Sequence, residues 1–177
     1  QTFSDFEFII LNDGSTDRTW EIIQEYAKKD SRIRPFSFPE KQGIAVGCNF
    51  TVAQAKGDYL ARIDGDDIWK PEKLEKQVAY LEEHPECGVC FTQVEIIDGQ
   101  GKIVHGAECD FMDELFAQPN RSQSQWLRKL FIDGNCFVHS SSVIRKNCFD
   151  AIDGYRNALR QLPDYDLWLQ LIQITEF

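Results

Sequence analysis

Apolar and polar positions divide the first half of the chain into strands and helices in turn. Three short, mostly apolar runs have the length and composition of buried strands, at 6–11, 33–38 and 59–63. Apolar residues at helical spacing follow each of them, over 17–29, 45–56 and 71–83. Pro35 places the second strand at an edge of the sheet. The alternating order predicts an α/β fold, with a mostly parallel sheet flanked by helices.

The pattern changes after residue 88. Apolar runs on both sides of Asp98-Gly99-Gln100-Gly101 predict a hairpin, and further strands are expected at 136–138 and 142–144. Helices are expected over 122–131, with Trp126, Leu127 and Leu130 inward, and over 164–173, with an irregular segment at 107–119. We therefore expect one domain over 1–177, in which 86–177 forms a small antiparallel and helical addition to the βα units of 1–85.

Three carboxylates crowd the turn between the third strand and the third helix, at Asp64-Gly65-Asp66-Asp67. Like charges this close repel one another unless a cation binds between them. Carboxylate oxygens on a tight turn suit Mg²⁺ or Mn²⁺, which commonly share their coordination with substrate phosphates. A plainer interpretation is a solvated acidic turn that caps the helix predicted to start at Pro71.

A second polar turn, Asn12-Asp13-Gly14-Ser15-Thr16-Asp17, follows the first strand. In parallel sheets ligands bind beyond the carboxyl ends of the strands, where both polar turns are expected to lie. Two such turns at one edge favour a ligand pocket more strongly than either turn alone.

Composition narrows the classes of ligand. The 177 residues carry a formal net charge of −10, which argues against a nucleic-acid surface, because phosphate contacts need clustered Lys and Arg. A ligand that carries phosphates would then need a metal to offset repulsion. The six cysteines include Cys87 and Cys90 in a C-x-x-C, but no second pair completes a zinc site, so incidental core cysteines in a reducing, cytoplasmic setting are expected.

Several stretches together resemble one known family. They are the two polar turns, Gly57-Asp58-Tyr59-Leu60, Lys73-Leu74-Glu75-Lys76-Gln77, Ser140-Ser141-Ser142-Val143-Ile144-Arg145-Lys146 and Pro163-Asp164-Tyr165-Asp166-Leu167-Trp168. In order and spacing they are similar to the inverting glycosyltransferases of family two, which have the GT-A nucleotide-sugar-binding fold. Each motif is weak by itself, but the set spans residues 6–172, which is nearly the whole chain.

The resemblance implies a role for each matching position. Asp13 would hydrogen-bond the nucleotide base, and Ser15 and Asn49 would belong to the same nucleotide-sugar site. Asp64 would lie near the ribose and the metal, and Asp66 would be the main protein ligand of Mn²⁺ or Mg²⁺. Asp164 would be the catalytic base. On a helix Asp166 points about 200° away from Asp164, so we expect it to face solvent or cap the backbone.

The resemblance also implies the reaction and its partners. A sugar would move from a nucleoside-diphosphate sugar, commonly UDP-linked in this family, to a hydroxyl of a glycan or lipid-linked acceptor in cell-surface polysaccharide synthesis. The expected location is the cytoplasm or the inner face of the membrane, with membrane contact only through segments outside this chain.

Three departures from the family pattern bear on these expectations. Cys48 stands where an Arg often helps to hold the donor, and Pro163 replaces the Glu that usually precedes the base. The family's first strand and helix, about 30 residues by ordinary βαβ lengths, would lie before Gln1.

Three other functions stay open from the sequence. A sugar nucleotidyltransferase also combines an α/β sheet with acidic metal ligands, although no glycine-rich loop with Lys or Arg is found here. A domain that binds a nucleotide without turnover would need the same pocket. A nucleotide-independent acidic metal-binding domain is the third alternative. Release of nucleoside diphosphate that depends on the donor separates the transferase from the first two.

Overall fold

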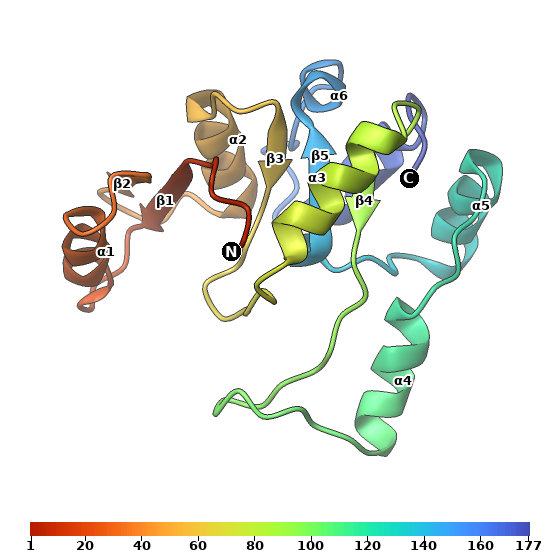
Figure 1. The fold of residues 1–177 in the computed structure, drawn as a ribbon, viewed down its shortest axis with the longest axis horizontal. Helices are drawn as coiled ribbons and strands as arrows, with labels where there is room; N and C mark the ends of the chain where they lie inside the picture. Colours follow the sequence, from red (N-terminus) through yellow and green to blue (C-terminus); the bar gives the residue numbers. More distant parts are fainter.

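The computed structural model describes the backbone of residues 1–177 and every side chain except those at 107, 108 and 113. The first half contains β1 (Phe8–Asp13), α1 (Thr19–Ala27), β2 (Ile33–Phe38), α2 (Ile44–Gln54), β3 (Tyr59–Ala61) and α3 (Lys73–Glu83). The second half contains β4 (Val89–Phe91), α4 (Ala107–Phe116), α5 (Gln123–Asp133), the 3₁₀ turn η1 (His139–Ser141), β5 (Ser142–Arg145), α6 (Lys146–Asp150) and α7 (Pro163–Leu171). Figure 1 shows their arrangement.

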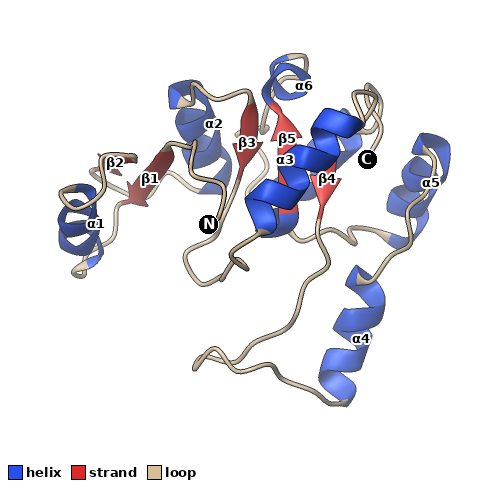
Figure 2. Ribbon diagram, viewed as in Figure 1, coloured by secondary structure: helices blue, strands red, loops and turns tan.

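The strands form one parallel and one antiparallel sheet (Figure 2). Strands β1 and β2 pair in parallel, with Phe8 opposite Ile33. The second sheet has the order β3-β5-β4, and β5 is antiparallel to both neighbours. The predicted α/β fold, with a parallel part and a small antiparallel addition, is confirmed. One detail differs: β3 pairs with β5 and not with the strands that precede it.

The direction of β5 determines which residues lie beside the ends of β3 and β4. Because β5 is antiparallel, its first residue Ser142 lies opposite Phe91, the last residue of β4, and Val143 lies opposite Ala61, the last residue of β3. The turn η1 directly precedes β5, so its residues lie beside the segments that leave β3 and β4.

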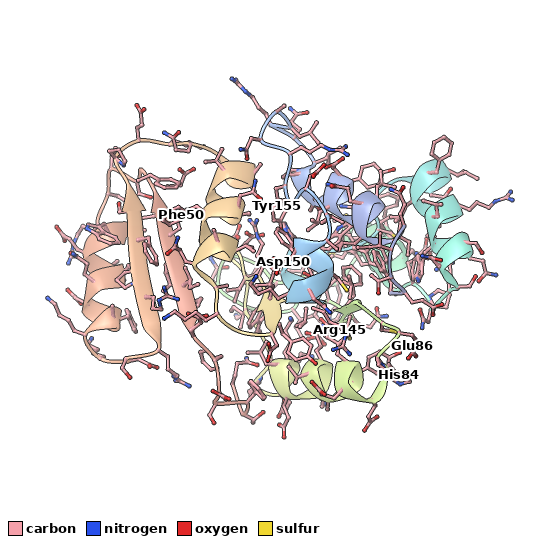
Figure 3. The ribbon with its side chains drawn as sticks, turned by 90° about the horizontal axis from the view of Figure 1, so that it is seen from above. Phe50, His84, Glu86, Arg145, Asp150 and Tyr155 are labelled. Carbon is pink, nitrogen blue, oxygen red and sulfur yellow. The ribbon has the colours of Figure 1, made fainter. Side chains whose placement is uncertain are left out.

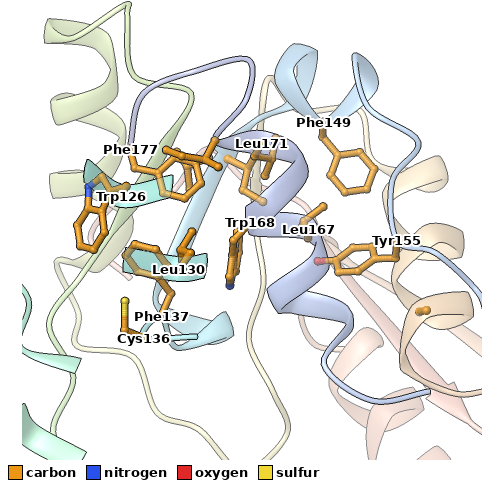
Figure 4. Close-up of a cluster of buried hydrophobic side chains, with 14 residues drawn as sticks. Trp126, Leu130, Cys136, Phe137, Phe149, Tyr155, Leu167, Trp168, Leu171 and Phe177 are labelled. Carbon is orange, nitrogen blue, oxygen red and sulfur yellow. The ribbon is translucent and has the colours of Figure 1, made fainter. Parts of the chain in front are cut away.

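The main core packs around α7 (Figure 4). Leu167, Trp168 and Leu171 have no exposed surface and hold the helix against the antiparallel sheet. Phe137 stacks on Phe91 with ring centroids 3.9 Å apart, and Trp168 meets Phe91 edge to face at 4.9 Å. Burying side chains of this size contributes about 1.5–3 kcal/mol each, which fixes the start of α7 relative to the sheet.

Among the described residues, no helix has both the length and the apolar composition that a bilayer-spanning helix needs.

Some predicted elements of the second half are wrong. Residues 107–116 form α4 and not an irregular segment, since Leu115 packs against the core cluster. The apolar Phe111 is 65% exposed, and an apolar residue on the exposed face obscures the helical pattern in the sequence. The predicted hairpin is present in a short form, with an antiparallel bridge between Ile97 and Ile103 and a hydrogen bond of 2.9 Å from the Val104 N–H to the Ile96 carbonyl. Residues 136–138 lead into η1 and do not form a strand.

Two local details also differ from the sequence prediction. Leu127 is 40% exposed and does not face the core, although Trp126 and Leu130 do. Helix α3 begins at Lys73, because Pro71 lies in the preceding turn.

Gly14 allows the first polar turn to pass under the loop before α2. Its φ is +71°, and a Cβ there would lie 2.5 Å from the Lys41 backbone nitrogen. We predict that Gly14→Ala lowers the free energy of unfolding by about 2–4 kcal/mol, because left-handed strain adds to a backbone clash. Gly99→Ala, with no atom within 4 Å of its Cβ, is the control and should be nearly neutral. Chemical denaturation measures both, and equal stabilities would contradict this packing.

Candidate functional site

The first polar turn is fixed by its own side chains. Asn12 is 5% exposed, and its Nδ2 donates to the Ser37 hydroxyl on β2 at 2.9 Å. Its Oδ1 accepts the Ser15 backbone N–H at 3.1 Å. Asn12 thereby ties the turn to the parallel sheet, and Ser15 stays exposed at its tip.

Asp13 holds the loop that leads into α2. Its Oδ1 accepts the Gln42 backbone N–H at 2.7 Å, and its Oδ2 accepts the Gly43 N–H at 2.9 Å. Gly43 precedes the first residue of α2, so Asp13 sets where that helix starts. A carboxylate oxygen has a further lone pair, so these bonds leave Asp13 able to accept another hydrogen bond.

Asp64 is held at the start of the acidic turn by Ser140 of η1. The Asp64 N–H donates to the Ser140 hydroxyl oxygen at 3.0 Å, and that hydroxyl lies 3.4 Å from Asp64 Oδ2. The Ser140 carbonyl accepts the indole N–H of Trp69 at 2.8 Å, so both ends of the turn are attached to η1. Arg62 donates from Nε to Asp64 Oδ1 at 3.0 Å.

Asp66 and Asp67 are the exposed carboxylates of this turn, and neither accepts a hydrogen bond from a described side chain. No group of three or more metal-ligating side chains is found among the described residues. The hard oxygens of Asp64 and Asp66 still fit Mg²⁺ or Mn²⁺, since Mg²⁺ sites usually take only one or two carboxylates and complete their coordination with phosphates and water.

The two carboxylates at the start of α7 have different environments. Asp164 Oδ2 accepts the Asn135 side-chain N–H at 2.8 Å. Asp166 is 14% exposed and pairs with Arg156, whose guanidinium nitrogen lies 2.6 Å from Oδ1. Gln170 donates to its Oδ2 at 2.8 Å. The expectation that Asp166 faces solvent or caps the backbone is wrong, because this ion pair holds the carboxylate against the loop before α7.

Asn49 joins α2 to a segment 106 residues further along the chain. Its Nδ2 donates to the Tyr155 carbonyl at 2.6 Å, and its Oδ1 accepts the Tyr155 N–H at 2.9 Å. Tyr155 therefore lies beside α2 (Figure 3), and in Figure 4 its ring points toward α7. Its hydroxyl lies 2.6 Å from His139 Nε2.

Burial keeps the groups around Tyr155 uncharged. Burial, together with the nearby Arg62 charge, lowers the pKa of His139 to about 3. Burial also raises the pKa of Cys48 to about 11 and raises that of Tyr155 well above its usual value. The charge of Asp64 raises the pKa of His139 and that of Asp164 raises the pKa of Tyr155, so each acid lies near one member of this hydrogen-bonded pair.

The residues expected at the site thus divide into two groups. Asp64 lies near His139 and Asp164 lies near Tyr155, whose side chains contact each other, and Asn49 holds the Tyr155 backbone. Among the described residues, no hydrogen bond links Asp13 or Ser15 to this group.

Four residues were not singled out from the sequence: Arg62, Asn135, Ser140 and Tyr155. Arg62 did carry a signal, as a charge within an otherwise apolar run. Ser140 lay within a stretch that resembles the family. Asn135 and Tyr155 occur in loops whose pattern gives no indication of a site, and only the packing around α7 reveals them.

His139 should make the protein sensitive to acid. The unfolded chain binds a proton at this histidine below its usual pKa of 6.5, whereas the folded protein does so only near pH 3. Stability is therefore lost as pH falls through this window, by up to about 1.4 kcal/mol per pH unit. We predict a shallower loss of stability between pH 6 and 4 for His139→Gln, measured by denaturant unfolding. His105→Gln, at an exposed position, should retain the wild-type slope; equal slopes for all three proteins would contradict the buried neutral histidine.

Comparison with known proteins extends these observations. The chain is 33% identical over 176 residues to the "Putative glycosyltransferase EpsE" of Bacillus subtilis, a match that covers 98% of this chain and 58% of EpsE. The chain therefore spans little more than half the length of this relative.

Two solved structures share its fold. Staphylococcus aureus TarS in complex with UDP-GlcNAc matches with a TM-score of 0.69 at 19% identity, over 97% of this chain and 44% of TarS. The mannosyltransferase PcManGT from Pyrobaculum calidifontis, in complex with GDP-Man and Mn²⁺, matches with a TM-score of 0.64 at 16% identity, over 92% of this chain and 42% of PcManGT. These similarities support the GT-A fold. The family model "Glycosyl transferase family 2" matches residues 1–152, so the chain belongs to this family of glycosyltransferases.

Proposed function

We propose that this protein is a metal-dependent inverting glycosyltransferase that moves a sugar from a UDP-linked donor to a hydroxyl of a glycan or lipid-linked acceptor. One observation carries the proposal: Asp64 of the acidic turn is bonded to Ser140, the residue after His139, and Asp164 of α7 lies near Tyr155, whose hydroxyl contacts His139. A transferase of this kind needs carboxylates for the donor and its metal, and one further carboxylate for the acceptor.

Asp164 has the surroundings of a general base. Its Oδ2 accepts a hydrogen bond from Asn135, which orients the carboxylate, and no hydrogen bond from the described residues reaches Oδ1. Oδ1 would therefore take the proton of the acceptor hydroxyl as that oxygen attacks the anomeric carbon. A single displacement with one base inverts the configuration at this carbon.

Asp66, with Asp64 as its neighbour, would hold Mn²⁺ or Mg²⁺. A bound cation would neutralise negative charge on the leaving diphosphate. Asp66 is the better ligand because it is exposed, whereas both oxygens of Asp64 have protein neighbours. The UDP-GlcNAc of the TarS complex and the GDP-Man and Mn²⁺ of the PcManGT complex support a nucleotide-sugar and a divalent cation here too.

The first polar turn would form the base side of the donor pocket. Asp13 would contribute in two ways, by contacting the nucleotide base and by holding the loop of Gln42 and Gly43 in place. Ser15 lies exposed on the same turn. Asn49 would act on the donor through Tyr155, whose backbone it fixes.

Asp66→Ala tests the metal assignment. We expect it to abolish Mn²⁺-dependent binding of UDP in calorimetry while the melting temperature without ligand stays unchanged, because Asp66 makes no contact that the fold needs. Asp67→Ala is the matched control on the same exposed turn and should retain binding. Wild-type affinity in Asp66→Ala would show that the metal ligand lies elsewhere.

The catalytic base is tested by two neighbouring variants. Asp164→Asn should lower turnover by at least about a hundredfold, with UDP affinity nearly unchanged, because only proton removal is lost. Asp166→Asn weakens the ion pair with Arg156 and should cost much less in turnover. Donor-dependent release of UDP measures both rates and separates a transferase from a domain that only binds the nucleotide. The assignment fails if Asp166→Asn is the inactive variant and Asp164→Asn turns over normally.

A further inference from the structure

Arg62 brings a positive charge into the acidic site. It follows β3 directly and precedes the acidic turn, and its side chain is 24% exposed. Its Nε and one terminal nitrogen both donate to the same oxygen of Asp64, Oδ1. Its other terminal nitrogen contacts the Cys48 sulfur on α2. The guanidinium is thus held between α2 and the acidic turn, with one side open to solvent.

The hydrogen-bonding capacity of Arg62 is only partly used. A guanidinium has five N–H groups and can bond both oxygens of a carboxylate in parallel, whereas here two donors converge on one oxygen. The third donor meets a thiol, which is a weak acceptor. The guanidinium also lies within hydrogen-bonding reach of the Tyr155 hydroxyl, and within the described part of the chain no backbone carbonyl accepts a hydrogen bond from Arg62.

Arg145 shows how a structural arginine of the same protein differs. Its Nε donates to the Cys87 carbonyl at 2.9 Å, one terminal nitrogen donates to the Tyr59 hydroxyl at 3.0 Å, and the other donates to the Leu81 carbonyl. These acceptors belong to the chain itself, so Arg145 crosslinks elements at the opposite end of β3. Arg62 has no comparable set of oxygen acceptors.

An arginine beside the acidic turn would offset the repulsion between the carboxylates of the turn and a phosphate ligand. A diphosphate beside Asp64, Asp66 and Asp67 would meet strong repulsion unless cations offset it. Lys70, a cation at the end of this turn, is 73% exposed and paired with Glu95 at 2.6 Å. A guanidinium can bond two phosphate oxygens at once, which a lysine cannot do with the same geometry.

We propose that Arg62 binds the diphosphate of the nucleotide-sugar donor, exchanging part of its contact with Asp64 for phosphate oxygens. Before the donor binds, Asp64 keeps the guanidinium aligned and compensates its charge. When the phosphates arrive, the contact with Cys48 supports the side chain from α2. This assignment rests on the proposed function, because it takes a nucleoside diphosphate as the ligand of the site.

Binding of UDP and of uridine, with Mn²⁺ present, tests the role of Arg62. We expect Arg62→Gln to weaken UDP binding by about 10- to 100-fold in calorimetry, as for a lost hydrogen bond to a charged group. Uridine binding, followed by ligand-observed NMR, should not change, since uridine carries no phosphate. Arg34→Gln is the matched control: this arginine is also half-buried and paired with a carboxylate, Glu7, but belongs to β2. It should bind UDP like the wild type.

The opposite result has a clear meaning. If Arg62 serves only to neutralise Asp64, its loss removes a cation that competes with the metal, and Arg62→Gln should bind UDP and Mn²⁺ as tightly as the wild type or more tightly. That result would overturn the assignment. A wild-type protein that binds no UDP would instead overturn the proposed function, so the two failures are distinguishable.

Arg62→Lys is a second variant that distinguishes the loss of the guanidinium from a folding defect. It retains the charge but not the paired donors, so UDP should bind more weakly than to the wild type while uridine binds equally. Unchanged uridine binding and an unchanged melting temperature without ligand show that the fold persists. Equal binding of UDP to wild type and Arg62→Lys would contradict recognition by the guanidinium.

Discussion

The antiparallel pairing of β5 between β3 and β4 is the constraint on which the site depends. Ser142 and Val143 have almost no exposed surface, and their register with both neighbours is fixed by the ladders on either side. This direction brings η1 to the ends of β3 and β4, where Ser140 reaches Asp64. A parallel β5 would place η1 at the opposite end of the sheet, and the acidic turn would lose this anchor.

The three carboxylates of the acidic turn differ in how far neighbouring groups compensate their charge. Asp64 has Arg62 and Ser140 as neighbours, so its position is set before any ligand binds. Asp66 and Asp67 are exposed and keep their oxygens available. A half-buried guanidinium beside exposed acids gives the turn both signs of charge, which suits a ligand that combines a cation with phosphates.

The hydrogen bonds between Asn49 and the Tyr155 backbone join the two halves of the chain. They link α2, which follows the first polar turn, to the segment that leads to Asp164. The Tyr155 hydroxyl contacts His139, and burial keeps both side chains uncharged. This contact between the two halves therefore consists of neutral groups, whose charge does not change with pH near neutrality.

The sequence by itself determined the βα units, the order of strands and helices up to α3, and the helix that carries Asp164, because hydrophobic periodicity is a local property. It also indicated the acidic turn, since turn residues and clustered carboxylates are visible in a short window. Only the tertiary structure decided that β5 lies between β3 and β4, that Asn49 bonds the Tyr155 backbone, and that Arg62 contacts Cys48 on α2. These contacts join residues far apart in the chain, and their partners are chosen by packing and buried hydrogen bonds that no local pattern of residues encodes.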